Sequence, residues 1–221
     1  MAVRTTDDLY VGGHFSAATM TVSNGAVDNA SVASDAAIAR SKLAQDTLVA
    51  FPVPFSSLRV HDAMQTVLPG TSATDDLGLY GGTFGTSQPL VRTYDVTAGG
   101  ATTLDARCLI PLPAEYDAGE TVTLRVYGGM VTTVADTTAT IDIEAHQVDK
   151  DNSISADLCA TAAQSINSLT FAAKDFTITP TTLTRGDLLD VRFAVAVNDG
   201  ATATAVIAAI AGIDLLCDIR G

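Results

Sequence analysis

The sequence contains no tryptophan, and aromatic residues make up only 5% of its 221 positions. This scarcity argues against a binding surface built mainly from exposed aromatic rings. Basic residues are also few, 12 against 25 acidic ones, which gives a formal net charge of −13. A surface with such an acidic excess repels phosphate groups, so we expect no binding to nucleic acid or to anionic membranes.

Long apolar runs are missing as well. The longest candidate, Ala205–Ile213, is about half as long as the roughly 18 apolar residues that a membrane-spanning helix needs. The first residues include Asp7 and Asp8 and lack the apolar centre of a secretory signal. We therefore expect a protein that stays outside membranes and is made in the cytoplasm.

The cysteines, Cys108, Cys159 and Cys217, are few and far apart. Their spacing excludes the close pairs of a zinc knuckle, and an odd number cannot form a fully paired set of disulfides. Cys108 and Cys217 each fall on the apolar side of an alternating segment. We expect the cysteines to be small core residues with unpaired thiols.

Local motifs of catalysis are absent: there is no G-x-S-x-G, P-loop, H-E-x-x-H or G-x-G-x-x-G pattern. The histidines, His14, His61 and His146, are widely spaced and show no metal-ligand spacing. We therefore expect no catalytic residue, no cofactor and no metal ligand. One alternative stays open, a calcium ion held by Asp side chains and loop carbonyls, because nearly all acidic residues are Asp.

What the sequence does contain is a series of alternating segments. Thr121–Tyr127, Thr140–Val148 and Leu189–Val197 place apolar residues at every second position, opposite polar or charged ones. This is the pattern of half-buried antiparallel strands. About eight such strands and no clear helix follow residue 48, which predicts an all-β, jelly-roll-like β-sandwich. The expected core includes Val122, Leu124, Val126, Ile141, Ile143, Phe176, Ile178, Val191, Phe193 and Val195.

The last apolar segment differs because Ala205–Ile213 is apolar on both faces. A buried, Ala-rich helix over Ala201–Ile213 is the alternative, since a short apolar run does not distinguish the two. As a strand, the segment has a second apolar face with Val206 and Ile210. We predict that this face contacts other subunits, and that closed symmetry gives a homotrimer.

Two glycine-containing segments are predicted to be loops or turns. Thr71–Ser87 has glycines at 78, 81, 82 and 85, which predicts an ordered loop with positive φ angles or close backbone contacts. Arg185, Gly186 and Asp187 form an RGD tripeptide immediately before an alternating strand. We interpret it as a turn rather than as an integrin ligand.

Residues 1–47 form a separate segment, the N-terminal arm, which precedes a body of residues 48–221. Ser23–Leu43 has too few large apolar residues for a core of its own. Asp35 can cap a short helix from Ala36 to about Gln45. We predict that the arm attaches the body to a partner; the alternative is a flexible tail. The expected anchors are Val27, Val32, Ile38, Arg40, Lys42 and Leu43.

The arm sequence NGAVDNASVASDAAIARSKL resembles Ala-rich segments ending in SKL or TKL in tailed-bacteriophage virion proteins. Stretches from LRVHDAMQTVLP through DDLGLYGGTFGT and LPAEYDAGETVTLRV to RGDLLDVRFAVAVND are similar to uncharacterised phage-like structural proteins. This similarity covers most of residues 57–221. It implies a virion component, assembled in the host cytoplasm, and transfers no catalytic residue.

Three functions follow as hypotheses. The first is a non-enzymatic capsid decoration (cement) or head-fibre protein, which self-associates and contacts the major capsid protein or another virion protein. The alternative is a host-receptor or glycan-binding module of a viral tail or fibre, for which Tyr80, Phe84 and Tyr94 are candidate aromatic contacts. An enzyme such as a polysaccharide lyase is third, and it requires convergent carboxylates or a Tyr/His/Arg set in a groove.

Overall fold

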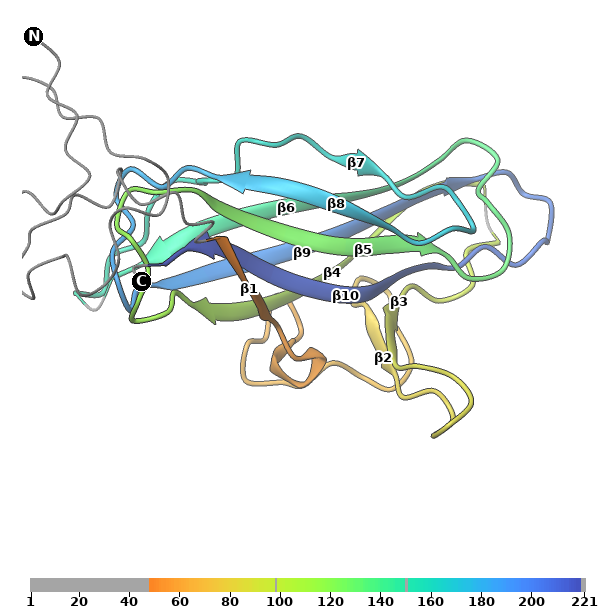
Figure 1. Ribbon diagram of the computed structural model, residues 1–221. Coiled ribbons are helices and arrows are strands. Elements are labelled where there is room, and N and C mark those ends of the chain that lie inside the picture. The colour runs from red at the N-terminus through yellow and green to blue at the C-terminus, as the bar shows by residue number, and fades with distance from the viewer. Residues whose placement is uncertain (1–47, 98, 150, 220–221) are drawn as a thin grey trace, which may run out of the picture. The chain divides into compact units, whose positions relative to one another are not determined.

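The computed structural model describes residues 48–97, 99–149 and 151–219, which form two antiparallel sheets packed face to face (Figure 1). Sheet A contains, in spatial order, β2 (Gly78–Tyr80), β3 (Leu90–Arg92), β10 (Ala208–Asp218), β5 (Val122–Met130) and β8 (Ala172–Ile178), and β1 (Leu48–Pro52) also pairs with β10. Sheet B contains, in order, β4 (Gly100–Pro111), β9 (Leu188–Asp199), β6 (Thr138–Val148) and β7 (Gln164–Ser165). The helical part of the described chain is a single 3-10 turn, η2 (Phe55–Ser57). The predicted all-β sandwich is confirmed.

Alternation along the strands directs one face of each sheet into a shared core. In sheet B, Phe193 on β9 lies between Ala106 on β4 and Ile143 on β6, and all three side chains are buried. Every core residue expected from the alternation is at most 2% exposed. Cys108 and Cys217 are buried and unpaired, as expected, whereas Cys159 is a half-buried free thiol.

The segment Ala205–Ile213, which is apolar on both faces, is covered by other parts of the same subunit. Residues 201–207 form no helix, so the helical alternative is wrong. Val206 and Ile210 are 1% and 0% exposed and belong to the core of this subunit, which corrects their predicted place on a trimer contact. On the sheet's outer side, the ring of Phe171 packs on Gly129 of the neighbouring strand, where a Cβ would come within 3.0 Å of it. The chain's own loop therefore covers this end of the sheet.

The described residues belong to one compact unit, Asp46–Gly221. No helix in this described part is long and apolar enough to cross a membrane. The helix expected over Ala36–Gln45 lies outside the described residues, and so do the arm anchors Val27, Val32, Ile38, Arg40, Lys42 and Leu43.

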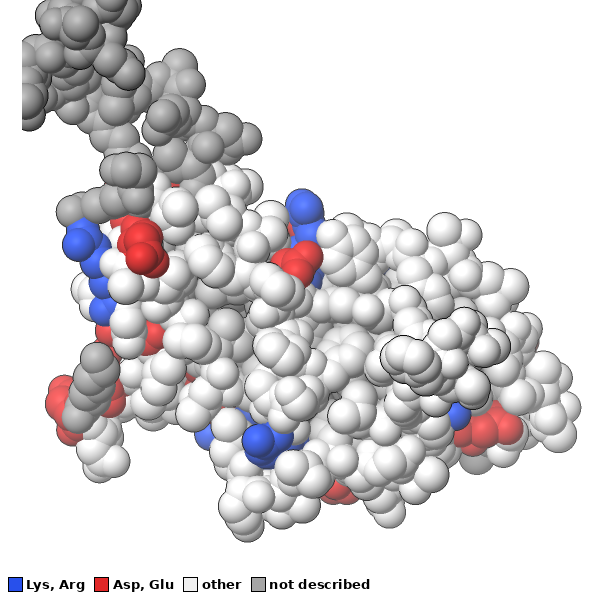
Figure 2. Space-filling model, turned by 60° about the horizontal axis from the view of Figure 1, so that its bottom comes forward, with Lys and Arg blue, Asp and Glu red and all other residues white. Residues whose placement is uncertain are grey.

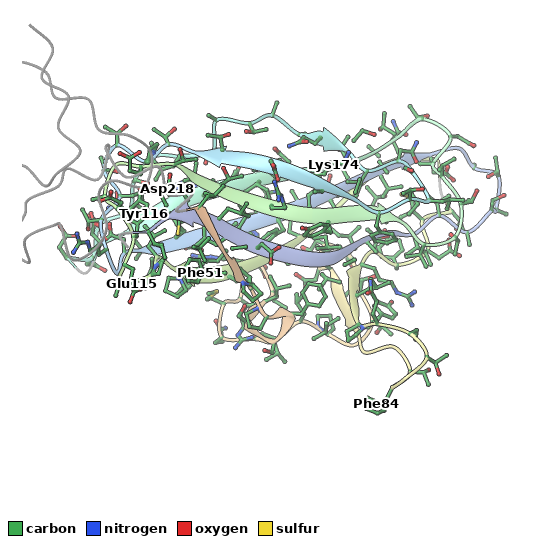
Figure 3. The ribbon with its side chains drawn as sticks, in the orientation of Figure 1. Phe51, Phe84, Glu115, Tyr116, Lys174 and Asp218 are labelled. Atoms are coloured by element: carbon green, nitrogen blue, oxygen red, sulfur yellow. The ribbon has the colours of Figure 1, made fainter. Side chains whose placement is uncertain are left out.

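The Gly-rich loop connects β2 and β3 at the edge of sheet A and extends away from the two sheets (Figure 1). Gly82 and Gly85 have φ angles of +66° and +73°, as predicted for this segment. The main-chain N–H of Thr83 donates to the hydroxyl of Ser87 at 2.8 Å, which closes the loop. Phe84 is fully exposed at the tip, away from the sheets (Figure 3).

Candidate functional site: a polar hollow on sheet B

The outer face of sheet B gathers charged side chains from strands that are far apart in the sequence. Because β4, β9 and β6 alternate, their non-core residues all point to the same side. Arg107, Arg192 and Glu144 are direct neighbours across these three strands. Arg59, in a segment that bonds to the edge of β4, extends the row by one position. Main-chain hydrogen bonds of 2.8 and 3.0 Å join Arg59 to Arg107.

Ion pairs fix the orientation of two of these arginines. Arg107 donates from Nε to Oδ1 of Asp190 at 2.7 Å and from Nη2 to the other oxygen. Arg192 donates from Nε to Asp105 at 2.9 Å and from Nη1 to Glu144 at 3.2 Å. These bonds raise the pKa of both guanidinium groups, with Asp190 the main cause at Arg107 and Asp105 at Arg192. Each planar group is thereby held by two hydrogen bonds, which restricts its geometry.

The charged side chains line a hollow of about 220 Å³, called here the polar hollow. Its lining is His61, Arg107, Glu144, His146, Ile154, Asp190 and Arg192. The fold thus brings His61 and His146 to one site, which their spacing in the sequence did not indicate. Nδ1 of His146 lies 3.0 Å from the main-chain oxygen of Ser155. His14 lies outside the described residues.

The polar hollow combines balanced charge with unused hydrogen-bonding groups. A guanidinium has five N–H donors, and Arg107 and Arg192 each use two of them in their ion pairs, so three remain on each. Glu144 accepts from Arg192 through one oxygen, and its side chain is 46% exposed. Two cations face the carboxylates of Glu144 and Asp190. This arrangement suits a neutral ligand with adjacent hydroxyl groups.

The arrangement is less suited to metal binding or to acid–base chemistry. Within the described ranges, no group of three or more His, Cys, Asp or Glu side chains could hold a metal ion. Each oxygen of Asp190 accepts one hydrogen bond from Arg107, so this carboxylate is held in its ionised form by the guanidinium. The hollow supplies the His and Arg of the set required by the lyase hypothesis, but no tyrosine lines it.

The aromatic residues considered for a glycan site do not meet. The guanidinium of Arg92 lies 3.4 Å from the ring centre of Tyr80 and covers it. Tyr94 packs against the core, and Phe84 is exposed at its loop tip. None of the three candidates lines the polar hollow.

The RGD tripeptide forms the predicted turn. Gly186 has a φ angle of +74°, and the main-chain N–H of Thr184 donates to Asp187 at 2.7 Å. Nε of Arg185 donates to the main-chain oxygen of Tyr116 at 3.2 Å. The side chains of Arg185 and Asp187 therefore both form hydrogen bonds within the protein, which favours a structural role for the tripeptide.

Charged side chains are sparse on another face of the molecule. On the face shown in Figure 2, charged side chains are few and scattered among uncharged residues. A second hollow, of about 290 Å³, lies beside β1 and is lined mainly by apolar side chains, including Phe51, Val53, Leu109 and Leu215. The charged lining thus distinguishes the polar hollow from this apolar one.

No protein-family model matches the sequence, and no curated protein matches it. Among solved structures, the CBM22-2 xylan-binding domain of Xyn10C from Paenibacillus barcinonensis is similar, with 11% identity, a TM-score of 0.42, and coverage of 76% of this chain and 98% of that chain. The mannan-recognising module TmCBM27 has 12% identity, a TM-score of 0.40, and coverage of 79% and 99%. The enzymatically active domain of tailspike protein 4 from bacteriophage CBA120 has 13% identity, a TM-score of 0.35, and coverage of 77% and 19%. These values are too low to transfer a function.

Proposed function

We propose that this protein is a non-enzymatic glycan-binding module of a viral tail or fibre, and that it binds its ligand in the polar hollow. The observation that carries the proposal is the pair of fixed guanidinium groups, Arg107 and Arg192, each with three N–H donors to spare. Neighbouring sugar hydroxyls both donate and accept, so a planar, fixed side chain can bind two of them at once. The viral setting rests on the sequence resemblance.

The balance of charge in the hollow supports a neutral ligand. The two guanidinium groups of the hollow are already paired with carboxylates: Arg107 with Asp190, and Arg192 with Asp105 and Glu144. A polyanion gains little from cations that carboxylates already neutralise. Because the side chains are held before the ligand arrives, less conformational freedom is lost on binding.

The non-enzymatic part of the proposal rests on how the carboxylates are used. Glycoside hydrolysis needs one carboxyl group that donates a proton and a second one that remains ionised. In the polar hollow, Asp190 and Glu144 both accept hydrogen bonds from guanidinium groups. We infer that they position arginines and bind hydroxyls rather than transfer protons.

A glycan array carrying neutral and acidic oligosaccharides tests this function. We expect binding to neutral oligosaccharides, and no reducing ends or unsaturated products when the bound glycans are incubated with the protein. An array without any bound glycan contradicts the proposal. The appearance of reducing ends or unsaturated products contradicts the non-enzymatic part of the proposal and supports the lyase hypothesis instead.

A structural role in a viral particle is the second candidate, and Phe84 is the observation that favours it. A large apolar side chain that is fully exposed on an ordered loop is typical of an anchor for protein contacts. We propose that Phe84, in place of Val206 and Ile210, contributes to self-association as a homotrimer. Sedimentation velocity should show a trimer for the wild type and dissociation for Phe84→Ser; a monomeric wild type contradicts this.

The attachment role of the N-terminal arm belongs to the same candidate. A protein lacking residues 1–47 retains all of β1, which pairs with β10 from Leu48 to Pro52. We expect this truncated protein to fold but not to co-sediment with phage particles that lack the protein. Co-sedimentation at the level of the full chain contradicts the attachment role.

A further inference from the structure

A third hollow, of about 340 Å³, lies where β8 of sheet A and β7 of sheet B meet the connecting loop. Its lining is Gly128, Ser165, Ile166, Asn167, Ser168, Thr170, Ala172 and Lys174. Lys174 on β8 pairs with Val126 on β5, and Val126 is fully buried in the core. Directly paired residues share a face of the sheet, so Lys174 lies on the inward side. Figure 3 shows it between β8 and β7.

The ammonium group of Lys174 has no partner within the described chain. The described arginines are all engaged by carboxylates, by main-chain oxygens or by an aromatic ring. The side chain of Lys174 makes neither a hydrogen bond nor an ion pair with any described residue, whereas its main chain pairs with β5. Among the described residues, no Asp or Glu lines this hollow. Lys174 is half-buried as a residue, and its ammonium group retains all three of its donors.

The surrounding loop adds further donors in fixed positions. The hydroxyl of Ser165 accepts the main-chain N–H of Asn167 at 3.4 Å, and that of Ser168 accepts the N–H of Thr170 at 3.1 Å. A hydroxyl that accepts in this way still has its own proton to donate. Asn167 is held by reciprocal hydrogen bonds of 2.8 and 2.9 Å with the main chain of Ala135. The loop is thus ordered without help from a ligand.

We propose that this hollow, the Lys174 pocket, binds an oxyanion: the carboxylate, sulfate or phosphate group of a small polar ligand. An ammonium and several hydroxyl donors without a carboxylate are the complement of such a group. A volume of about 340 Å³ lies at the lower end of the range for small-molecule sites. The pocket is separate from the polar hollow, so this inference goes beyond the glycan binding proposed there.

Amide NMR titrations of the full chain test the pocket with four probes: glucuronate, inorganic phosphate, sulfate and neutral glucose, with ionic strength held constant by chloride. We expect glucuronate or an inorganic oxyanion to shift the amides of residues 165–174, and glucose to leave them unchanged. A shift with glucuronate alone identifies a carboxylate on a sugar as the ligand, and equal shifts with phosphate or sulfate identify a free oxyanion. The absence of shifts with all three anions, or equal shifts with glucose, overturns the proposal.

Substitutions of Lys174 test whether its positive charge binds the anion. Lys174→Gln should weaken anion binding at least about tenfold, because a charge-assisted hydrogen bond is lost, while Lys174→Arg should retain most of it. The matched control is Arg185→Gln, which removes the same charge from an exposed turn outside the lining. Since Lys174 has no structural partner, amides outside residues 165–174 should not change in Lys174→Gln. Equal anion affinities for Lys174→Gln and the wild type overturn the proposal.

Discussion

Arg107 and Asp190 lie 83 positions apart in the sequence, yet Nε of the guanidinium donates to Oδ1 of the carboxylate at 2.7 Å across β4 and β9. The Asp190 side chain is only 8% exposed, whereas that of Arg107 is 34% exposed. A carboxylate so far removed from water depends on its partner for hydrogen bonds. The pair therefore stabilises sheet B and orients Arg107 in the polar hollow.

Replacing Asp190 by Asn removes this charge and nearly conserves the shape. We expect the free energy of unfolding in urea to fall by about 1–3 kcal/mol, as for other hydrogen bonds to charged groups. The matched control is Asp175→Asn, which breaks a pair with Arg125 on the exposed face of sheet A. Solvent screens that pair, so its loss should be smaller. Equal losses in the two variants contradict the structural role of Asp190.

Phe193 tests the packing of the core. Its side chain is 0% exposed between Ala106 and Ile143, so Phe193→Ala should lower the free energy of unfolding by about 3–5 kcal/mol. Phe84→Ala is the control, because it removes the same atoms from an exposed loop tip and should change stability by less than about 0.5 kcal/mol in the unassociated protein. A loss below about 1 kcal/mol for Phe193→Ala would show that the register is wrong.

The thiols should differ in reactivity. Burial raises the pKa of Cys108 to about 12 and that of Cys217 to about 11, so almost no reactive thiolate is present near neutral pH. The half-buried Cys159 also has a raised pKa, mainly through burial, and should react before the other two. Mass spectrometry of labelled peptides measures the order. Rapid labelling of Cys108 or Cys217 without denaturant contradicts their burial.

The same burial predicts a loss of stability in alkali. In the unfolded chain the Cys108 thiol has its ordinary pKa of 9.0, against about 12 in the folded protein. Between these values the unfolded state binds fewer protons than the folded state, so the free energy of unfolding falls as the pH rises. This part of the stability is fully present below pH 9. Urea unfolding across that range should show a flatter decline for Cys108→Ala, and an unchanged decline would assign it to other groups.

Period-two alternation was enough to predict the β-sandwich and its core. It also indicated that Glu144, His146, Asp190 and Arg192 point outward, because each stands between buried neighbours on its strand. It did not identify the polar hollow, since Arg107 meets Asp190 only through a pairing of distant strands. Outward charges of opposite sign on several strands were the one available signal.

The apolar positions at the start of β10 were harder to interpret. A strand that is apolar on both faces is compatible with a subunit contact or with cover from the same chain. Val206 and Ile210 are buried inside the subunit, and Phe171 packs on Gly129 on the outer side. The sequence around Phe171 shows no signal of this long-range contact. The alternating pattern alone therefore wrongly assigns Val206 and Ile210 to a contact between subunits.

The central claim is that the polar hollow binds a glycan, and calorimetric titration with the strongest array ligand tests it most directly. The wild type is compared with Glu144→Gln, inside the hollow, and with Glu115→Gln, an exposed position outside it (Figure 3). Both substitutions remove the same charge, and unchanged melting temperatures establish that both variants are folded. We predict at least about tenfold weaker binding for Glu144→Gln, because a charged hydrogen-bond acceptor is lost, and unchanged binding for Glu115→Gln. Equal affinities for all three proteins would contradict the account.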